Sequence, residues 1–367
     1  MRTPAIVFIL CIGLLIPAHA SFGIEAEKES GNLALSIKNI SFFKNNEYSN
    51  PLIEGYTLTG YFVQPELVFQ PSEKVVLQAG AHLLKYSGTN RYATAKPVFS
   101  ITYKLSDISR FVMGSLPGSD SHRMFDPHFN KERVYTENTE EGVGFTLQKD
   151  NLFTDTWLSW ENYIFKGDGE REIFTAGESF RYSSPIILSR FHLEIPLQIL
   201  VKHYGGQISD YPEPVETYYN TSAGIRMYGS AKTEKLFQTG LETLLFHGGE
   251  LSGKSLTGIN NGNAWWFRLF CKYSRAELEA GYWISHNYYS PNGNFIFSSV
   301  SSFRENTLVR DRKMLTFSAA LDLVPEDFLG IYFGFDAYYD TVLKKLDHAL
   351  TLHLRFDKLI RLADIKS

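Results

Sequence analysis

The side chains best suited to chemistry gather in one stretch, between residues 118 and 140. Four of them are of the types that bind Zn²⁺ or Mn²⁺: Asp120, His122, Asp126 and His128. Three cationic side chains lie among them and would repel a metal ion: Arg123, Lys131 and Arg133. A metal site is therefore one interpretation of this stretch, but the balance of charges predicts no metal and no cofactor.

Motifs that mark known classes of enzyme are missing from the sequence. Gly114–Gly118 comes nearest to the hydrolase pattern G-x-S-x-G, but its serine is second and its centre is Leu116. The chain also lacks the patterns G-x-x-x-x-G-K-[ST], H-E-x-x-H and C-x-x-C. A lipid-directed enzyme in a barrel would need a Ser/His or Asp/His pair at the outer rim, and the sequence supplies no clear pair. We therefore predict no catalytic residue and no enzymatic activity.

The first residues have the pattern of a secretory signal. Arg2 supplies a positive charge, residues 5–16 are apolar, and Ala18-His19-Ala20 is an A-x-A cleavage site. The apolar run is too short to cross about 30 Å of hydrocarbon as a helix. We therefore expect a signal peptide at 1–20, cleaved near Ala20, and one domain over 21–367. The remaining cysteine, Cys271, cannot form an internal disulfide.

Composition narrows the class of protein further. The formal net charge is −4, which argues against a nucleic-acid partner. Aromatic residues make up 15% of the chain, yet after the signal no apolar stretch is long enough for a transmembrane helix. Rich aromatic content without long apolar runs is typical of a membrane β-barrel, which hides its apolar half in alternation.

Alternation of apolar and polar residues is the main structural signal. In Phe191–Lys202, for example, Leu193, Ile195 and Leu197 alternate with His192 and Glu194. Histidines within such segments fall mostly on the polar phase: His82, His192, His203, His247 and His353. The pattern predicts strands at 32–43, 56–70, 73–86, 95–106, 108–117, 141–150, 153–166, 171–182, 189–203, 217–229, 233–247, 264–274, 276–287, 307–323, 328–340 and 347–360.

Connections between these segments alternate between short and long. Residues 71–72 and 106–107 form tight turns, whereas 45–54, 87–94 and 118–140 are long. This rhythm predicts an all-β, transmembrane, antiparallel up-and-down barrel of about sixteen strands, with short periplasmic turns and long extracellular loops. A soluble β-sandwich is the alternative, and it should lack the two classes of connection.

The loop at 118–140 is the candidate constriction. A barrel of this size leaves an aqueous channel, and the apolar Met124, Phe125 and Phe129 favour a loop that folds inward. Its pore-constriction residues would be Asp120, His122, Arg123, Asp126, His128 and Arg133. Charges predicted to line the lumen opposite them are Lys104, Glu161, Glu194, Lys202, Arg226, Glu242, Arg268, Lys272, Glu279, Asp322, Asp336 and Arg355. An external loop that contacts lipopolysaccharide or a neighbouring protomer remains the alternative.

This pattern resembles the porin-type outer-membrane barrels of Gram-negative bacteria, through its signal, strand number and long third loop. In detail it is similar to uncharacterised barrels of Bacteroidota type, in phrases such as Trp160-Glu161-Asn162 and His203–Gln207. Porins usually end in an aromatic residue, whereas here Phe356 is followed by eleven further residues. The insertion signal is then internal, or the last strand is longer than drawn.

The resemblance implies passive or weakly selective diffusion of small hydrophilic solutes through a porin-like channel. It also implies outer-membrane lipid, lipopolysaccharide and the barrel-assembly machinery as partners, and a homotrimer as a common assembly. A non-conducting barrel is the alternative function. It would act as an adhesin or as an accessory subunit of a secretion or nutrient-uptake complex.

Overall fold

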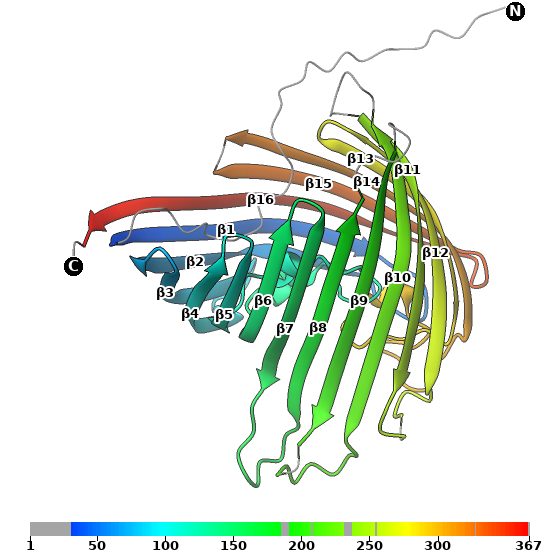
Figure 1. Cartoon of the computed structure of the whole chain (residues 1–367). Helices are drawn as coiled ribbons and strands as arrows, with labels where there is room; N and C mark the ends of the chain where they lie inside the picture. The colour runs from blue at the N-terminus through cyan, green and yellow to red at the C-terminus, as the bar shows by residue number, and fades with distance from the viewer. Residues whose placement is uncertain are drawn as a thin grey trace, which may run out of the picture.

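The computed structural model describes residues 31–184, 191–206, 208–230, 237–253, 255–326 and 328–365. The expected signal peptide, 1–20, lies outside these residues. The described residues form sixteen strands in one closed antiparallel barrel, in which each strand pairs with its chain neighbours and β1 pairs with β16 (Figure 1). The predicted fold class is confirmed.

The strands are β1 (Asn32–Glu47), β2 (Tyr56–Ser72), β3 (Val75–Tyr86), β4 (Thr94–Ser106), β5 (Ser109–Ser115), β6 (Glu141–Lys149), β7 (Leu152–Asn162), β8 (Glu172–Ser183), β9 (Phe191–Gly205), β10 (Glu216–Ser230), β11 (Phe237–Glu250), β12 (Asn261–Tyr273), β13 (Ala276–His286), β14 (Asp311–Glu326), β15 (Leu329–Asp340) and β16 (Lys345–Asp364). The described residues also form the helical turns η1 (Ser119–His122), α1 (Arg133–Thr136) and η2 (Phe295–Phe297). No helix among them has the length and apolar character needed to span a membrane.

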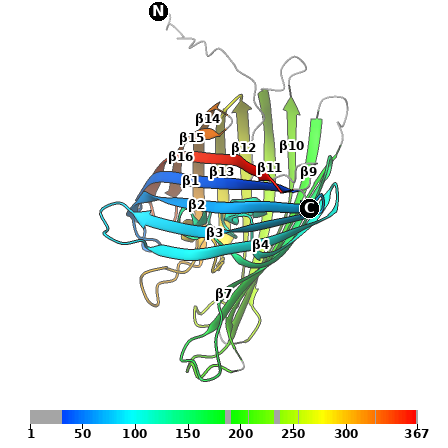
Figure 2. The ribbon, with the colours of Figure 1, turned by 90° about the vertical axis from the view of Figure 1, so that its left-hand side faces the viewer.

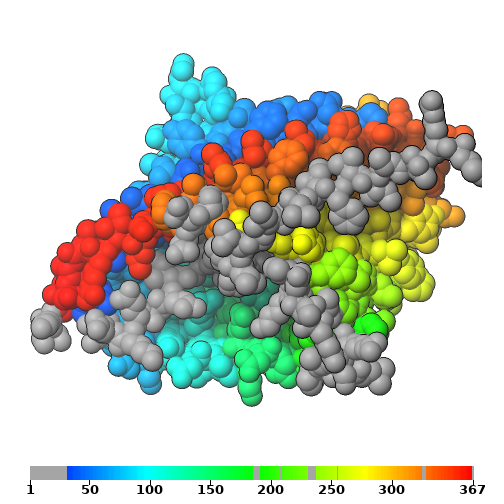
Figure 3. Space-filling view, turned by 90° about the horizontal axis from the view of Figure 1, so that it is seen from above, coloured from blue at the N-terminus to red at the C-terminus, as the bar shows by residue number. Residues whose placement is uncertain are grey.

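Several strand ends differ from the sequence prediction by up to four residues, and two of them have a clear physical reason. β16 runs on to Asp364 because its last residues still pair with β1, down to the pair Asn32 and Asp364. β14 begins at Asp311 rather than at 307 because the residues just before it pair within the loop: Leu308 bridges Val300, and Val309 N–H donates to the Ser299 carbonyl. Figure 2 shows β1 and β16 side by side at this closure, and in Figure 3 the red of β16 borders the dark blue of β1.

The outside of the barrel is apolar. Outward-facing Leu67, Phe99 and Leu269 expose 50%, 54% and 65% of their surface, although all three are large hydrophobic residues. A wall of this kind is stable only against another apolar phase, which for a closed barrel is lipid. The exterior therefore has the character that the alternation predicted.

The interior is less wet than the sequence predicted. Near the long-loop end, a packed cluster of aromatic and aliphatic residues fills part of the lumen: Ile53, Phe125, Leu244, Phe246, Ala264, Trp266, Trp283, Tyr288, Ile296, Phe297, Met314 and Tyr338. Loop residues 116–140 and 287–310 supply several of its members, including Phe125, Tyr288 and Ile296. The expectation of an aqueous channel lined by charge was wrong there, because loops that fold inward bring their own apolar side chains.

Candidate functional sites

His122 fixes the loop 116–140 to the barrel wall. Its Nδ1 lies 2.6 Å from Asp155 Oδ2 on β7, and its Nε2 lies 2.7 Å from Glu140 Oε2. The ring stacks on Trp157 with 3.7 Å between ring centroids, and a Cβ at Gly177 would collide with that indole. Burial lowers the pKa of His122, but the two carboxylates outweigh burial and raise the pKa to about 9. Both nitrogens therefore donate, which suits a clamp and leaves no lone pair for a base.

The other residues of the predicted constriction lie apart from one another. Three pair with different partners: Asp120 with Arg355 (4.0 Å), Asp126 with Asn294 (2.9 Å) and Arg133 with Glu137 (2.7 Å). His128 is fully buried between Phe246 and Tyr288, and this burial lowers its pKa to about 3. The Arg123 guanidinium lies 3.9 Å from the centre of the Phe153 ring. Among the described residues no group of His, Cys, Asp or Glu converges as metal ligands.

Charges predicted to line the lumen lie on the inward positions of their strands: Lys104, Glu161, Glu194, Lys202, Arg226, Glu242, Arg268, Lys272, Glu279, Asp322, Asp336 and Arg355. Several compensate one another across strands. Arg268 lies between Glu242 and Glu279, and Lys202 pairs with Glu161. The lumen wall therefore carries charge, much of it locally neutralised.

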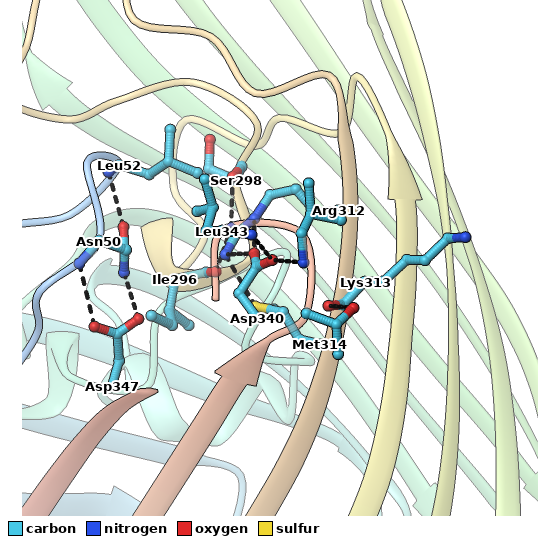
Figure 4. A network of polar contacts seen from close by, with 12 residues as sticks. Asn50, Leu52, Ile296, Ser298, Arg312, Lys313, Met314, Asp340, Leu343 and Asp347 are labelled. Atoms are coloured by element: carbon cyan, nitrogen blue, oxygen red, sulfur yellow. Dashed lines mark hydrogen bonds and ion pairs between the residues drawn. The ribbon is translucent and has the colours of Figure 1, made fainter. Parts of the chain in front are cut away.

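A fully buried arginine fastens the second inward loop, 287–310. Arg312 pairs with Asp340 across β14 and β15 at 2.8 Å, and its Nη1 donates to the carbonyls of Ile296 and Ser298 at 2.6 and 2.8 Å (Figure 4). Beside it, Asn50 and Asp347 join the first long loop to β16. A buried guanidinium needs several acceptors, and here strand and loop supply them together.

The outer face of the same wall carries a row of polar residues, which we call the outer row. Its members are directly opposite one another on β10 to β14: Thr221, His247, Asn263, His286 and Asp311. The next residues along each strand face inward and form the inner row: Ser222, Phe246, Ala264, Ser285 and Arg312. The outer row thus lies on the exterior of the barrel near its long-loop end.

His286 and Asp311 form the one acid–imidazole pair of the outer row. Their Nδ1 and Oδ1 atoms are 2.7 Å apart, and the side chains are 55% and 73% exposed. A carboxylate only accepts, so Nδ1 donates and Nε2 becomes the basic nitrogen. The side-chain Nδ2 of Asn287 lies 3.0 Å from Nε2, and Arg310 Nη1 donates to the side-chain Oδ1 of Asn287 at 3.0 Å. This is the arrangement of an oriented general base beside a cation.

Sequence reasoning missed this pair because its members are separated by the long loop 287–310. The structure also places His203 and His247 on the outward phase, where their partners are Thr217 and Tyr219. One signal was present in the sequence: His286 ends one strand, and Asp311 stands near the start of the next. A hairpin register that begins at Asp311 brings them together, whereas the predicted strand 307–323 did not.

Solved structures with a similar fold come from outer-membrane proteins. A loop L8 deletion mutant of OmpT, an outer membrane protein of Vibrio cholerae, has a TM-score of 0.52 and 10% identity, over 90% of this chain and all of that one. Pseudomonas aeruginosa OccK2 (OpdF), solved with glucuronate, has a TM-score of 0.52 and 9% identity, over 92% of this chain and all of that one. Pseudomonas aeruginosa OpdL gives 0.51 and 10%, over 90% and 99%. These likenesses show the fold of a porin-type outer-membrane barrel.

No curated protein matches the sequence. A family model described as lipid A 3'-O-deacylase-type matches residues 24–365. This is an enzyme family, so the prediction that the protein is not an enzyme was wrong. The error arose because the absence of known sequence motifs was taken as the absence of an enzymatic activity. The match spans nearly the whole chain, and the chain therefore belongs to the lipid A 3'-O-deacylase-type family.

Proposed function

We propose that the protein is an outer-membrane ester hydrolase that removes an acyl chain from a lipid A-type glycolipid, with His286 as general base. The proposal rests on one observation, the exposed pair of His286 and Asp311 on the outward face of the barrel. Family membership supports the class of reaction and the class of substrate. It replaces the expectation that catalytic residues are absent.

The position of the pair suits an ester at a membrane surface. On the same outward phase lie Ile284, two residues from His286 and 36% exposed, and Leu315, four residues from Asp311 and 53% exposed, so apolar wall begins close to the pair. Lys313 and Arg310 are the nearby exposed cations. Acyl chains lying along the apolar wall would place their ester linkages near His286 and their anionic headgroups near the cations.

The chemistry follows from the geometry of the pair. A water in the place of the Asn287 amide would give its proton to His286 Nε2 while its oxygen attacks the ester carbonyl. Asp311 stabilises the imidazolium that forms, and Arg310 is placed to stabilise the oxyanion. Collapse of the tetrahedral intermediate breaks the acyl C–O bond, and Nε2–H returns the proton to the leaving alkoxide. The products are a free fatty acid and an alcohol on the sugar.

The test uses the purified full chain and lipid A in mixed micelles, with mass spectrometry for the released fatty acid and the mass lost from lipid A. His286→Ala should lower the rate by about 10²–10⁴-fold, the range for a general base. His247→Asn is the matched control, since His247 is an outward histidine whose partner is a tyrosine hydroxyl. Absence of acyl release by the native protein would refute the function. A fully active His286→Ala would refute the assignment of the base.

A second candidate function is the passage of small hydrophilic solutes through the lumen. A specific observation favours it: a cavity lies between the loop 116–140 and the wall of β1 to β5, lined by polar residues that include Gln64, Gln78, Ser100, Thr102 and Asn138. Purified protein in planar bilayers should then show stepwise conductance in salt. A tight seal under all conditions would point instead to a non-conducting barrel.

A further inference from the structure

We propose that the lumen contains a binding site for a small multivalent oxyanion, formed by Arg110 on β5, Arg123 on the inward loop and Arg181 on β8. We call these residues the arginine cluster. The arginines would bind the carboxylate or phosphate oxygens of the anion, because a planar guanidinium donates two parallel N–H groups to such oxygens. The cluster lies on the inner face of the barrel and takes no part in the proposed hydrolysis.

Cross-strand register brings the cluster together near the short-turn end of the barrel. Phe153 on β7 is directly opposite Arg181 on one side and Gln148 on the other. The Arg123 guanidinium lies over the Phe153 ring at 3.9 Å, and its Nη2 donates to Gln148 Oε1 at 3.2 Å. Arg110 is opposite Thr146, two residues before Gln148 on β6. Direct and diagonal neighbours on one face are within reach of long side chains.

The backbone is shaped to deliver Arg123 to this place. Its φ of 53° is in the left-handed region, which is unfavourable for a residue with a Cβ. Gln198 on β9 holds the residue there, because its Nε2 donates to the Arg123 carbonyl oxygen at 3.0 Å. Strain that is kept by a specific anchor is characteristic of functional positions.

The positive charge of the cluster is left uncompensated. Within the described residues, none of the three arginines forms an ion pair, whereas Arg226 and Arg268 elsewhere on the lumen wall do. Asp155, the carboxylate whose charge acts on Arg123, already accepts from His122 on one oxygen and from Thr146 on the other. Burial lowers the pKa of Arg123, and Arg181 and Arg110 lower it further while Asp155 raises it. A bound anion would relieve this repulsion.

The arginine cluster is accessible from inside the barrel. All three side chains are only partly buried, and Arg110 lines the cavity between the inward loop and β1 to β5. The lining of that cavity includes Thr102 and Ser115 on the side of Arg110. Partial burial strengthens the attraction for an anion, because the local dielectric is lower than that of water.

Isothermal titration of the purified full chain in nonionic detergent at low salt tests the site. The probes are citrate, inorganic phosphate and, as a neutral control, glucose. We expect saturable binding of an anion, with at least a tenfold weaker Kd in Arg123→Gln/Arg181→Gln. Binding of citrate alone assigns a carboxylate ligand, and binding of phosphate alone assigns a phosphate ligand. Either result, or both, supports the site.

Arg226→Gln is the matched control, because Arg226 also stacks on a lumen aromatic ring, Phe270 at 3.8 Å, but is paired with Glu277. Its Kd should stay within twofold of the native value. Heat-dependent electrophoretic mobility checks that each variant has a folded barrel. The proposal is overturned if neither anion saturates the native protein, if the double variant binds as well as the native protein, or if Arg226→Gln weakens binding equally. Hydrolysis of lipid A by the double variant should be unchanged, so this proposal and the proposed function fail separately.

Discussion

The two faces of the barrel wall at the start of β14 differ in burial and in the partners of their charged side chains. Arg312 points inward, is fully buried and has its charge satisfied by Asp340 and two loop carbonyls. Asp311, the preceding residue, points outward, is 73% exposed and holds a single imidazole. One residue along a strand thus separates a buried anchor from an exposed acid–imidazole pair.

Two histidines show the same contrast between a buried and an exposed side chain. His122 lies between two carboxylates and is buried, so its proton is held on both nitrogens and the residue serves as a clamp. His286 has one carboxylate and is exposed, which leaves Nε2 available as a base. The number of acidic partners and the access of solvent decide the role of each ring.

Disruption of the exposed pair of His286 and Asp311 should have the largest effect. Asp311→Asn retains the shape of the pair but cannot stabilise an imidazolium, so we expect the rate of acyl release to fall together with that of His286→Ala, by two orders of magnitude or more. Acyl release from lipid A measures the effect, and His122→Gln serves as the inner counterpart. If His122→Gln abolished hydrolysis while Asp311→Asn did not, the roles of the two faces would be reversed.

Removal of the inner anchor should chiefly cost stability. Arg312→Met leaves Asp340 buried without its partner, which typically costs about 3–5 kcal/mol. Urea unfolding in lipid vesicles measures the free energy of unfolding. Arg226→Met is the control, since Arg226 is partly exposed with its carboxylate at 3.9 Å and its loss should cost less than about 1 kcal/mol. Equal losses in the two variants would mean that burial does not distinguish the two ion pairs.

The strands could be predicted from the sequence, whereas the pairing of His286 with Asp311 could not. Alternation is a local signal, so it located the sixteen strands and the inward charges such as Arg268 and Glu279. The pairing of His286 with Asp311 depends on register across a loop of more than twenty residues, which no local pattern encodes. The apolar filling of the lumen depends on where loops fold, and Phe297 or Tyr288 carries no mark of that in the sequence.

The clamp at His122 should open in alkaline solution. Its pKa is about 9 in the folded protein against an ordinary value of 6.5, so its stabilisation is fully present below pH 6.5 and is lost as the pH rises through 9. This difference in pKa corresponds to about 3 kcal/mol of stabilisation of the folded protein. Asp155, Glu140 and Arg133 are the charged groups that surround the ring.

Tryptophan fluorescence follows this titration because Trp157 stacks on the His122 ring. We expect a transition near pH 9 in the native protein that is absent from Trp157→Phe. The clamp is lost as the pH rises, because the imidazolium is the form of His122 that both carboxylates bind. A flat profile from pH 7 to pH 10.5 in the native protein would contradict the clamp.

The smallest effect should come from Asn287, which links the base to the cation on the outer face. Asn287→Gly removes the amide that contacts His286 Nε2 and Arg310, and glycine adopts the φ of 51° without strain. Water takes the place of the amide at Nε2 during the reaction, so the contact that matters is the one from Arg310 to Asn287 Oδ1. Loss of this hydrogen bond, worth about 1 kcal/mol, lowers the rate of acyl release about fivefold. An unchanged rate would show that Arg310 reaches the oxyanion without Asn287. A loss as large as that of His286→Ala would make Asn287 part of the reacting group, and the simple contrast between a buried clamp and an exposed base would have to include a third residue.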